Sequence, residues 1–401
     1  MTATMPPTTA ATPTVPIRLQ NLNSDLAAHF YERTEVLRAA TITLLAGKHM
    51  LMLGPPGTAK SDLIRELTAR IDQARYFETL MSPFADPTAM FGPIDVAALQ
   101  QGEYKQLLSG RATDADIVFI DEIFKSGDGA LQALLTYLNE RKYHPLNGEP
   151  PKDCPVLSVF AASNELPQGE ALNAFFDRLL VRIEVDYLHD TTNFTGLLRS
   201  SGPAPASQFP LTITELNHAV RHEVPQISVP DPVINAYVEL RAELKEDGIV
   251  ASDRRWKQSI RLLQASAYLD GRTGVTRDDM QILDHVLWTE PPQRPTVARA
   301  LINKISPGSA EAVEIMDAMA ALERELDDLL KNQTAEDTLR TWAASESLPK
   351  CKNAETKLNT LRQNAQAKAL STKAIDQAEA ARSRFANRVV SEALGMNMAA
   401  I

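Results

Sequence analysis

The sequence predicts an α/β protein in which helices cover both faces of a parallel sheet, followed by a helical region without strands. Three observations predict this class. The apolar run "HMLMLG" at 49–54 leads through the loop "GPPGTAKS" into the helical stretch "SDLIRELTARI". Two more short apolar runs, 116–121 and 156–163, alternate with helical stretches, as is typical of parallel sheets. Beyond "SGPAPASQFP" at 201–210 the strand pattern disappears.

The segment before the loop is predicted to be helical. "SDLAAHFYERTEVLRAATITLLAG", residues 24–47, has apolar residues at helical spacing and should end at Gly47. Residues 1–19 are rich in Pro, Thr and Ala, so we expect a mobile tail. The segment has neither a basic start nor an apolar core, so it is not expected to be a secretory signal.

Two further elements complete the predicted α/β domain, which spans residues 20–200. "ALQALLTYLNER" at 130–141 has the spacing of a helix, and "RLLVRIEVDY" predicts another strand near 180–187. Each apolar run is rich in Val, Ile and Phe and is bounded by polar or turn residues, which indicates buried strands.

The remainder of the chain is predicted to be helical. Residues 201–295 form a small helical domain that contains "RRWKQSIRLLQASAYLDG", and the proline cluster "EPPQRP" at 290–295 marks its end. Residues 296–401 are predicted to form a helical hairpin or bundle. Its first apolar stripe comprises Ala312, Ile315, Met316, Met319, Leu322, Leu326, Leu329 and Leu330, and its second comprises Leu358, Leu361, Ala365, Ala369, Ile375, Ala378 and Ala381. The stripes pack on each other or bind a partner.

Composition bounds the classes of function. The chain of 401 residues has a formal charge of −10, which argues against a nucleic-acid coat protein or a basic membrane-surface protein. No apolar run approaches the roughly 20 residues that span a bilayer. Cys154 and Cys351 are far apart and have no metal-ligand spacing, so we expect reduced thiols and a cytoplasmic protein.

The loop after the first strand has the features of a phosphate-binding loop. Gly54 and Gly57 let the backbone turn and aim N–H groups at phosphate oxygens. Lys60 supplies charge to the β- and γ-phosphates, and the Ser61 hydroxyl is a ligand for Mg²⁺. Ala59 stands where this motif usually has a glycine, and alanine should fit if the position has helical φ and ψ. The predicted nucleotide-binding residues are Gly54, Pro55, Pro56, Gly57, Thr58, Ala59, Lys60 and Ser61.

Polar side chains end the next two strands. Asp121 and Glu122 close "IVFIDE", where Asp121 is placed to hold Mg²⁺ and Glu122 to orient or deprotonate an attacking water. Asn164 follows "AAS", where its amide can hydrogen-bond that water and the γ-phosphate. The alternative for the acidic pair is a helix N-cap, which the preceding loop makes less favourable. The alternative for the asparagine is an ordinary turn, which would be favoured for the residue by itself but not in this strand order.

Four arginines are candidates for stabilising transition-state charge, an effect worth roughly 10³-fold or more in rate. "FFDRLLVR" contains Arg178 and Arg182, and "SDRRW" contains Arg254 and Arg255. The alternative for each is a surface ion pair worth about 0–1 kcal/mol.

Together these residues resemble the AAA+ ATPases and, among them, the RavA-like branch of the MoxR family. "GPPGTAKS", with Ala59 before the lysine, is the MoxR form of the loop. The similar stretches span about residues 30–290 and are "YERTEVLRAATITLLAG", "LGPPGTAKS", "FGP", "IVFIDEIFK", "LLTYLNER", "AASNELP", "DRLLVRI" and "SDRRWKQSIRLLQASA".

The resemblance implies an AAA+ αβα core with a small helical lid and a C-terminal helical extension. It assigns Lys60 and Ser61 to Walker A and Asp121 and Glu122 to Walker B. It matches Asn164 to sensor 1. It further matches Arg178 to the arginine finger and Arg254 to sensor 2, with Arg182 and Arg255 as second choices. It implies Mg-dependent ATP hydrolysis, a hexameric ring, and a companion protein with a von Willebrand A domain whose metal site the ring helps to load or remodel.

The resemblance ends near residue 300. RavA-like proteins carry a β-rich module there that contacts a decarboxylase, and residues 309–401 show no strand pattern. The decarboxylase partnership is therefore not expected, and the protein client is unknown. Two other classes compete with a remodelling ATPase: a nucleic-acid-acting motor, for which "KQLLSGR" at 105–111 is the nearby basic segment, and a module in which ATP only drives assembly or binding.

Overall fold

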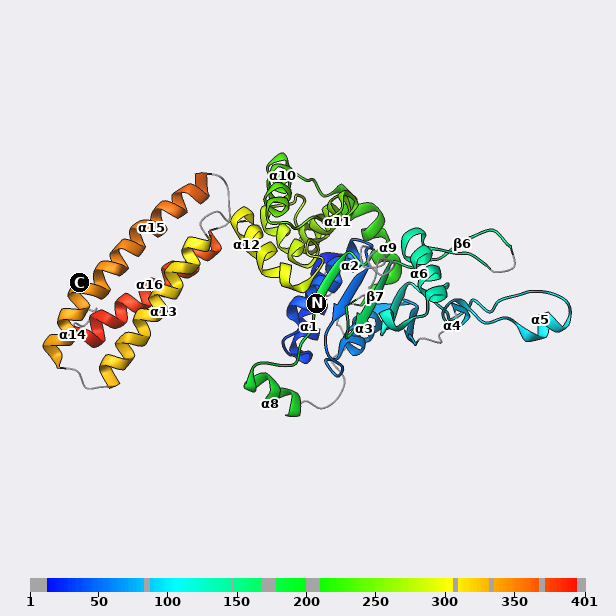
Figure 1. Cartoon of the computed structure of the whole chain (residues 1–401), viewed down its shortest axis with the longest axis horizontal. Coiled ribbons are helices and arrows are strands. Elements are labelled where there is room, and N and C mark those ends of the chain that lie inside the picture. The colour runs from blue at the N-terminus through cyan, green and yellow to red at the C-terminus, as the bar shows by residue number, and fades with distance from the viewer. Residues whose placement is uncertain are drawn as a thin grey trace, which may run out of the picture. The chain divides into compact units, whose positions relative to one another are not determined.

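A computed structural model describes residues 13–82, 87–145, 148–166, 178–199, 210–305, 309–331, 335–367 and 372–394 (Figure 1). The chain divides into two compact units. Unit 1 comprises Met1–Pro230, Ala251–Val275 and His285–Leu287, and unit 2 comprises Asp231–Val250, Thr276–Asp284 and Trp288–Ile401.

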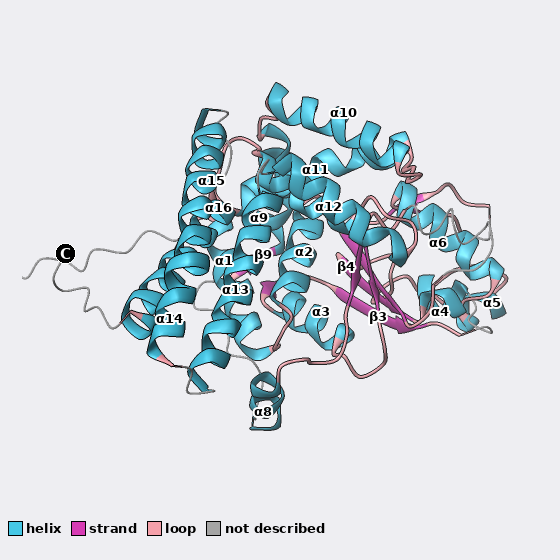
Figure 2. Ribbon diagram, turned by 60° about the vertical axis from the view of Figure 1, so that its left-hand side comes forward, coloured by secondary structure: helices cyan, strands magenta, loops and turns pink. Residues whose placement is uncertain are grey.

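Unit 1 is built on a five-stranded sheet in which every neighbouring pair is parallel (Figure 2). The strands, in spatial order, are β3 (Tyr76–Leu80), β4 (Ile117–Asp121), β7 (Ser158–Ser163), β1 (Met50–Leu53) and β8 (Val181–Glu184). The predicted strands at 49–54, 116–121, 156–163 and 180–187 are therefore present. Because all strands are parallel, their carboxyl ends lie along one edge of the sheet.

The inner strands are those that the apolar runs predict. Every residue of β1 and β7 is buried, as are the first four residues of β4. Strand β3 is an edge strand in which no residue is fully buried, and Glu78 and Thr79 interrupt its apolar residues. That pattern explains why the sequence did not predict it.

Helices cover this sheet. The helices of unit 1 before the sheet and around it are α1 (Val15–His29), α2 (Thr34–Leu45), α3 (Lys60–Ala69), α6 (Asp128–Glu140) and α8 (Thr191–Arg199), with α9 (Ile213–His218) and α11 (Asp253–Leu269) later in the chain. Helix α3 packs on β4 and β7, α2 packs on β8, and α11 packs on α1 and α2.

The segment predicted as one helix to Gly47 forms two helices. The chain turns between α1 and α2, where Phe30 is extended and Glu32 has φ 58°. This left-handed residue interrupts the helix, although the apolar spacing continues on both sides. The predicted end at Gly47 agrees with the structure, where Gly47 has φ 58° after α2.

Short elements extend from this core. They are β2 (Ile71–Asp72) paired with β9 (Leu211–Thr212), β5 (Lys142–Tyr143) paired with β6 (Lys152–Asp153), α4 (Pro87–Phe91), α5 (Val96–Gln100), the 3₁₀ turns η1 (Ile123–Lys125) and η3 (Val224–Gln226), and the π-helical turn η2 (Ala219–Glu223). In Figure 1, α5 lies in a loop that projects away from the sheet.

Unit 2 contains helices alone among its described residues. Its first part comprises α10 (Asp231–Glu246), η4 (Arg277–His285), η5 (Pro291–Gln293) and α12 (Arg294–Ile305). Helix α12 packs on α10, so this helical packing continues past the predicted boundary at 295. The predicted linker at 201–210 lies almost wholly outside the described residues.

The rest of unit 2 is a bundle of long helices, which the two apolar stripes predict. It comprises α13 (Ser309–Lys331), α14 (Glu336–Trp342), η6 (Ala343–Ser347), α15 (Leu348–Ala367), α16 (Lys373–Arg388) and η7 (Val389–Ala393). Helix α13 packs on α16, and α15 packs on α16. Stripe residues such as Leu326, Leu358 and Ala378 are fully buried together, whereas Leu330 is exposed.

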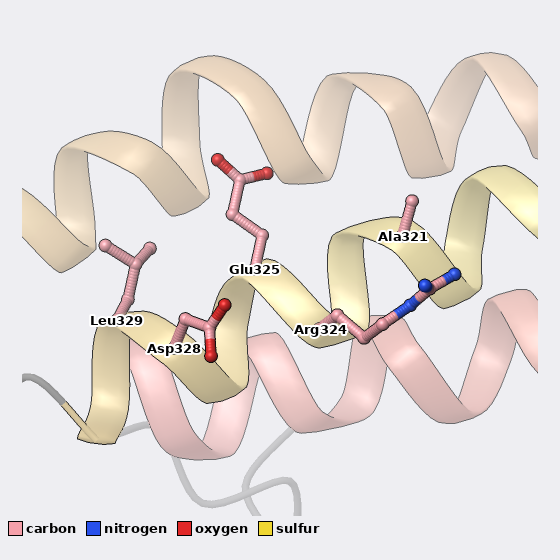
Figure 3. A pocket seen from close by; sticks show the side chains of 5 residues that line it. All are labelled: Ala321, Arg324, Glu325, Asp328 and Leu329. Atoms are coloured by element: carbon pink, nitrogen blue, oxygen red, sulfur yellow. The ribbon is translucent and has the colours of Figure 1, made fainter.

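Figure 3 shows the outer stripe of α13, which borders a hollow of about 400 Å³. Its lining residues Ala321, Arg324, Glu325, Asp328 and Leu329 recur every three or four positions and therefore share one face of the helix. Within the described part of the chain, no helix is both long enough and apolar enough to cross a bilayer.

Candidate functional site

The carboxyl edge of the sheet brings the predicted loop and acidic residues together. The loop follows β1, Asp121 ends β4, and Asn164 comes directly after β7. Strand β7 lies between β1 and β4, so these three segments are neighbours. Open parallel sheets bind ligands at this edge.

Gly54 is required by the packing of the loop's first turn. Its φ is 151°, and a Cβ at this position would lie 2.0 Å from the carbonyl oxygen of Val185. The Gly54 amide donates to the carbonyl of Ser163, and the Val185 amide donates to that of Leu53. The loop therefore begins pressed between the ends of β7 and β8.

Ala59 has a left-handed conformation, with φ 62° and ψ 29°, immediately before α3. We expected right-handed helical φ and ψ to accommodate this alanine, and this expectation is wrong because the residue is left-handed. An L-residue in this region costs roughly 1–2 kcal/mol, a penalty that glycine avoids. The loop therefore adopts the backbone that favours glycine while carrying an alanine.

Lys60 is buried at the base of the loop. Its ammonium donates to the carbonyls of Gly54 at 2.8 Å and Pro55 at 2.7 Å and lies 3.3 Å from the Thr58 hydroxyl. Burial lowers the pKa of Lys60, an effect opposed by Asp121 and Glu122. The amine is thus held inside the loop, facing the acidic pair that ends β4.

Glu122 and Asn164 are in direct contact. The Asn164 Nδ2 donates to Glu122 Oε1 at 2.7 Å, and Lys125 Nζ lies 3.3 Å from Glu122 Oε2. Glu122 itself has φ 52°, and its amide donates to Asp121 Oδ1 at 2.9 Å. The acidic pair and the amide therefore form one polar cluster, although Glu122 and Asn164 are 42 positions apart in sequence.

Beside the loop lies a hollow of about 540 Å³ that the sequence did not predict. Gly57, Thr58 and Ala59 form one wall. The remaining lining is largely aromatic, from Phe30, Tyr31, Tyr187 and Phe194. A flat aromatic base fits such a lining, because stacked rings gain both buried area and favourable geometry.

Arg33 and Asp62 are charged residues of this hollow that the sequence analysis missed, and Arg33 is the cation of the two. Its guanidinium is buried and donates to the backbone carbonyls of Glu32 at 3.2 Å and Asp186 at 2.5 Å. Burial lowers the pKa of Arg33. The turn that interrupts the predicted helix delivers it here, so only the "FYER" break between α1 and α2 could have signalled it.

Glu32 ties the start of α8 to the same turn. Its carboxylate accepts hydrogen bonds from the amides of His189 and Asp190, both at 2.9 Å, and from Asn193 Nδ2 at 3.0 Å. These bonds, the His189 amide first, lower the pKa of Glu32 to about 2. We call the hydrogen-bonded group of Glu32, His189, Asp190 and Asn193 the clasp.

The predicted arginines lie away from the loop within one chain. Arg178 precedes β8, and β8 runs parallel to β1 with Val181 opposite Met50. Arg178 therefore lies at the amino edge of the sheet, where the strands begin. Arg182 is fully buried in β8 and donates to the carbonyl of Val286, so it is not available to another subunit.

Arg254 and Arg255 begin α11. Arg254 donates to the side-chain oxygen of Asn139, near the end of α6, and shares a hollow with Lys48, the second residue before β1. Arg254 is therefore also at the amino edge, opposite the loop. Arg255 is buried, with 5% of its surface exposed. The structure brings together the Walker-type residues and Asn164 but not these arginines.

Two family models match successive segments of the chain. The model of the MoxR domain in the MoxR-vWA-beta-propeller ternary systems matches residues 17–208, and an AAA lid domain model matches residues 232–301. Two uncharacterised proteins of Methanocaldococcus jannaschii are similar. One is 33% identical over 307 residues, covering 75% of this chain and 80% of the relative. The other is 34% identical over 274 residues, covering 68% and 70%.

A solved structure shares the fold. A proposed ATPase of Cytophaga hutchinsonii aligns with a TM-score of 0.60 at 17% identity, covering 72% of this chain and 94% of that chain. The parallel sheet, the helical lid match and this alignment establish an AAA+ αβα fold with a helical lid. With the phosphate-loop geometry at the edge of that sheet, the chain belongs to the MoxR family of AAA+ ATPases.

Proposed function

We propose that this protein hydrolyses ATP with Mg²⁺ and uses the energy to remodel or activate a protein partner. The observation that supports hydrolysis most strongly is the hydrogen bond from Asn164 to Glu122 at the sheet edge that carries the loop. It joins a carboxylate suited to general base catalysis with an amide suited to positioning water.

The loop residues are suited to hold the polyphosphate. Backbone N–H groups of residues 57–61 and the start of α3 favour anions, and Lys60 adds a positive charge. Exchanging the carbonyl partners of Lys60 for phosphate oxygens would restore full charge compensation to its ammonium. Thr58, which now donates to the Pro55 carbonyl, braces the loop.

The donor set also fits Mg²⁺. Ser61 offers a hydroxyl and Asp121 a carboxylate, both hard oxygen ligands of the kind that this ion prefers. Asp121 Oδ1 already accepts the Glu122 amide, which orients the carboxylate. When bound, Mg²⁺ would neutralise charge on the β- and γ-phosphates.

The adenine ring would occupy the aromatic hollow beside the loop. Tyr31, Tyr187 and Phe194 supply flat surfaces, and Arg33 supplies a buried cation near Gly57 and Ala59. The clasp holds α8, which carries Phe194, against this hollow. This assignment makes α8 part of nucleotide binding.

A ring of subunits, a hexamer by resemblance, would complete the active site. Arg178 lies at the amino edge and does not share the loop's edge in its own chain. This is the position expected of an arginine finger, which acts on the nucleotide of a neighbouring subunit rather than on that of its own chain. Arg254, in the sensor 2 role, would likewise serve a neighbouring subunit.

The partners follow from the family. The matched domain model belongs to systems that pair MoxR with von Willebrand A and β-propeller proteins, so we infer a von Willebrand A companion. Among MoxR proteins we propose the RavA-like branch and a cytoplasmic location. Client contact is proposed at the α5 loop, where Val96 (65% exposed), Leu99 (50%) and Leu107 (53%) expose apolar surface.

Glu122→Gln tests the proposed function. The amide is isosteric but cannot act as a base, so ATP turnover should fall about 100-fold or more while nucleotide binding persists. Glu140→Gln, at the end of α6, is the matched control and should turn over normally. Normal turnover by Glu122→Gln would refute the site, and nucleotide-dependent assembly of a wild-type protein without turnover would favour an ATP-dependent binding module. Salt-sensitive binding of single-stranded DNA would favour a nucleic-acid motor.

A further inference from the structure

Five basic side chains gather at the amino edge of the sheet, at the end of β1 opposite the loop. Lys48 precedes β1, Arg141 follows α6, and Arg254, Lys257 and Arg261 come from successive turns of α11. A hollow of about 460 Å³ is lined by Lys48, Arg254, Lys257, Gln258 and Arg261. We call this the basic hollow.

Among the residues that the structure describes, none is an acidic partner of these cations. Within the described ranges, no carboxylate pairs with Lys48, Lys257 or Arg261. Arg254 donates to the amide oxygen of Asn139, and Arg141 donates to backbone carbonyls. The Nη1 of Arg261 is buried without a hydrogen-bond partner. Buried donors in folded proteins usually have a protein, water or ligand partner, and this one lines a hollow with other cations.

The cluster is costly for the isolated chain. Burial, followed by the charges of Arg141, Arg261 and Arg254, lowers the pKa of Lys48 to about 8. Burial also lowers the pKa of Arg261. The chain as a whole carries −10, so a concentration of positive charge here is not a property of its average surface. An anion with several charges would relieve this repulsion.

The chain's own nucleotide cannot supply that anion. Strand β1 has four residues and separates the loop from the basic hollow by about 13 Å of extended chain. The two lie on opposite edges of one sheet. At the loop, Asp62, Asp121 and Glu122 are acidic, and a bound polyphosphate would add to that charge. The acidic loop edge of one copy can therefore face the basic hollow of another copy, whereas the two edges of a single copy are too far apart to meet.

Resting on the ATP-hydrolysing function above, we propose that the basic hollow receives the phosphates of a nucleotide held by the loop of a second copy, with Lys48 and Arg261 as phosphate-binding residues beside Arg254. Joining one edge to the opposite edge of the next copy is a head-to-tail contact, which closes into a ring when the rotation permits. Arg178 lies at the same amino edge and would approach the same nucleotide.

A mixing experiment tests this assignment. Lys48→Met/Arg261→Met retains the loop and lacks the basic hollow, whereas Lys60→Ala retains the basic hollow and lacks the loop. Each protein alone should lose at least 10-fold in ATP turnover. Random 1:1 assembly should restore about a quarter of wild-type turnover, because half the subunits supply a loop and half of their neighbours supply a basic hollow. Lys142→Met is the charge control and should behave as wild type, because Lys142 is a partly exposed lysine that pairs with Asp153.

The outcomes separate this proposal from the function it rests on. Turnover by Lys48→Met/Arg261→Met at the wild-type rate would overturn the role of the basic hollow. Loss of turnover without recovery on mixing would show that it acts within its own chain or on a free anion. If the wild type hydrolyses no ATP, the proposed function fails, and assembly decides the proposal. Glu122→Gln should assemble in Mg-ATP, as measured by light scattering. Introducing Lys48→Met and Arg261→Met into the same chain should weaken that assembly at least 10-fold. Equal assembly of the two variants, or no assembly of Glu122→Gln, would overturn the proposal.

Stability separates a binding role from a structural one. A lowered lysine pKa means that the folded chain disfavours the ammonium at pH 7, so Lys48→Met should melt at a higher temperature than wild type while losing turnover. Lys48→Arg retains the charge and should retain turnover. A Lys48→Met protein that loses turnover and melts lower, together with an inactive Lys48→Arg, would indicate a structural role instead.

Discussion

At the residue scale, Glu122 is positioned by its neighbours. The Asn164 amide binds one carboxylate oxygen and Lys125 lies beside the other, so the side chain has little freedom at the end of β4. In the proposed mechanism, this hydrogen bond orients Glu122 toward the attacking water. We therefore propose that Asn164 acts through Glu122 as well as toward the nucleotide.

Asn164→Ala tests this coupling. We expect ATP turnover to fall about 10- to 100-fold, because Glu122 loses its orienting donor, while ATP affinity changes by less than about 3-fold. Steady-state kinetics and equilibrium binding measure the two effects separately. Asn359→Ala, on α15, is the control and should leave both unchanged. An unchanged turnover in Asn164→Ala would show that the hydrogen bond has no catalytic role.

Ala59→Gly tests the strain in the loop. Relief of the left-handed alanine recovers about 1–2 kcal/mol, and the entropy of glycine in the unfolded chain removes about 0.5–1. The thermal midpoint of unit 1 should therefore rise slightly. Ala69→Gly, in the right-handed helix α3, is the matched control and should lose about 1 kcal/mol. Equal losses in both variants would contradict the strain.

Residue identity predicted this part of the site well, because phosphate chemistry restricts the choice to a few residue types at the ends of buried strands. Gly54, Lys60, Asp121 and Asn164 are brought to one edge as expected. Their catalytic and binding roles stay predictions. The handedness of Ala59 could not be predicted, because φ at one loop residue depends on how the whole loop closes.

At the element scale, the clasp connects a turn to a helix. Glu32 adopts its left-handed conformation where α1 and α2 separate, and its carboxylate holds the backbone at the start of α8. Helix α8 buries none of its own residues, so these hydrogen bonds are a large part of what fixes its start. Arg33, the next residue, is placed by the same turn.

Glu32→Ala should release α8. We expect ATP affinity to fall about 3- to 10-fold and the His189 and Asp190 amides to exchange with solvent more than 10-fold faster at pH 7. Because the folded state lowers the pKa of Glu32 to about 2, the wild-type clasp is complete above its ordinary pKa of 4.5 and is lost as pH falls through 2. Hydrogen exchange at pH 4 should therefore still show protection. Asp25→Ala, on α1, is the control, and protection unaffected by Glu32→Ala would exclude the clasp.

Elements with a full apolar face were predictable, and elements defined by long-range contacts were not. Strands β1, β4 and β7 are buried throughout and stand out as apolar runs. The break between α1 and α2 was missed because its cause, the partners of Glu32, lies about 157 residues away in sequence. Helical spacing alone cannot reveal a turn that distant groups stabilise.

At the scale of the whole molecule, the C-terminal bundle has a core of its own. The apolar stripes predicted it because helices that pack only on each other must bury one face each. Helix α14 adds Trp342 to that core, which the two stripes did not include. The role of this bundle cannot be predicted from packing, since an exposed helix face such as the outer stripe of α13 is equally compatible with contact to solvent and with contact to a partner.

Leu358→Ala tests the independence of the bundle. Its side chain is fully buried, so truncation should cost about 2–5 kcal/mol. Calorimetry should show one transition moved to lower temperature, with ATP turnover unchanged because the loop and Glu122 belong to unit 1. Leu330→Ala, an exposed residue of the same bundle, should change stability by less than about 0.5 kcal/mol. A single transition that moves as a whole, with lost turnover, would show that the bundle and unit 1 unfold together.

The contact between Gly54 and Val185 also limits how this lineage can change. Any substitution at Gly54 places a Cβ 2.0 Å from a backbone oxygen, which no rotamer can avoid. Backbone cannot be removed by a second mutation in the way that a crowding side chain can. A descendant could replace this glycine only after β8 had shifted away from β1, and that shift would separate strands whose pairing builds the sheet. Neither change can therefore come first, because the substitution needs the shift of β8 and the shift disrupts the sheet. The packing of the sheet alone requires glycine at the first residue of the loop, independently of nucleotide binding.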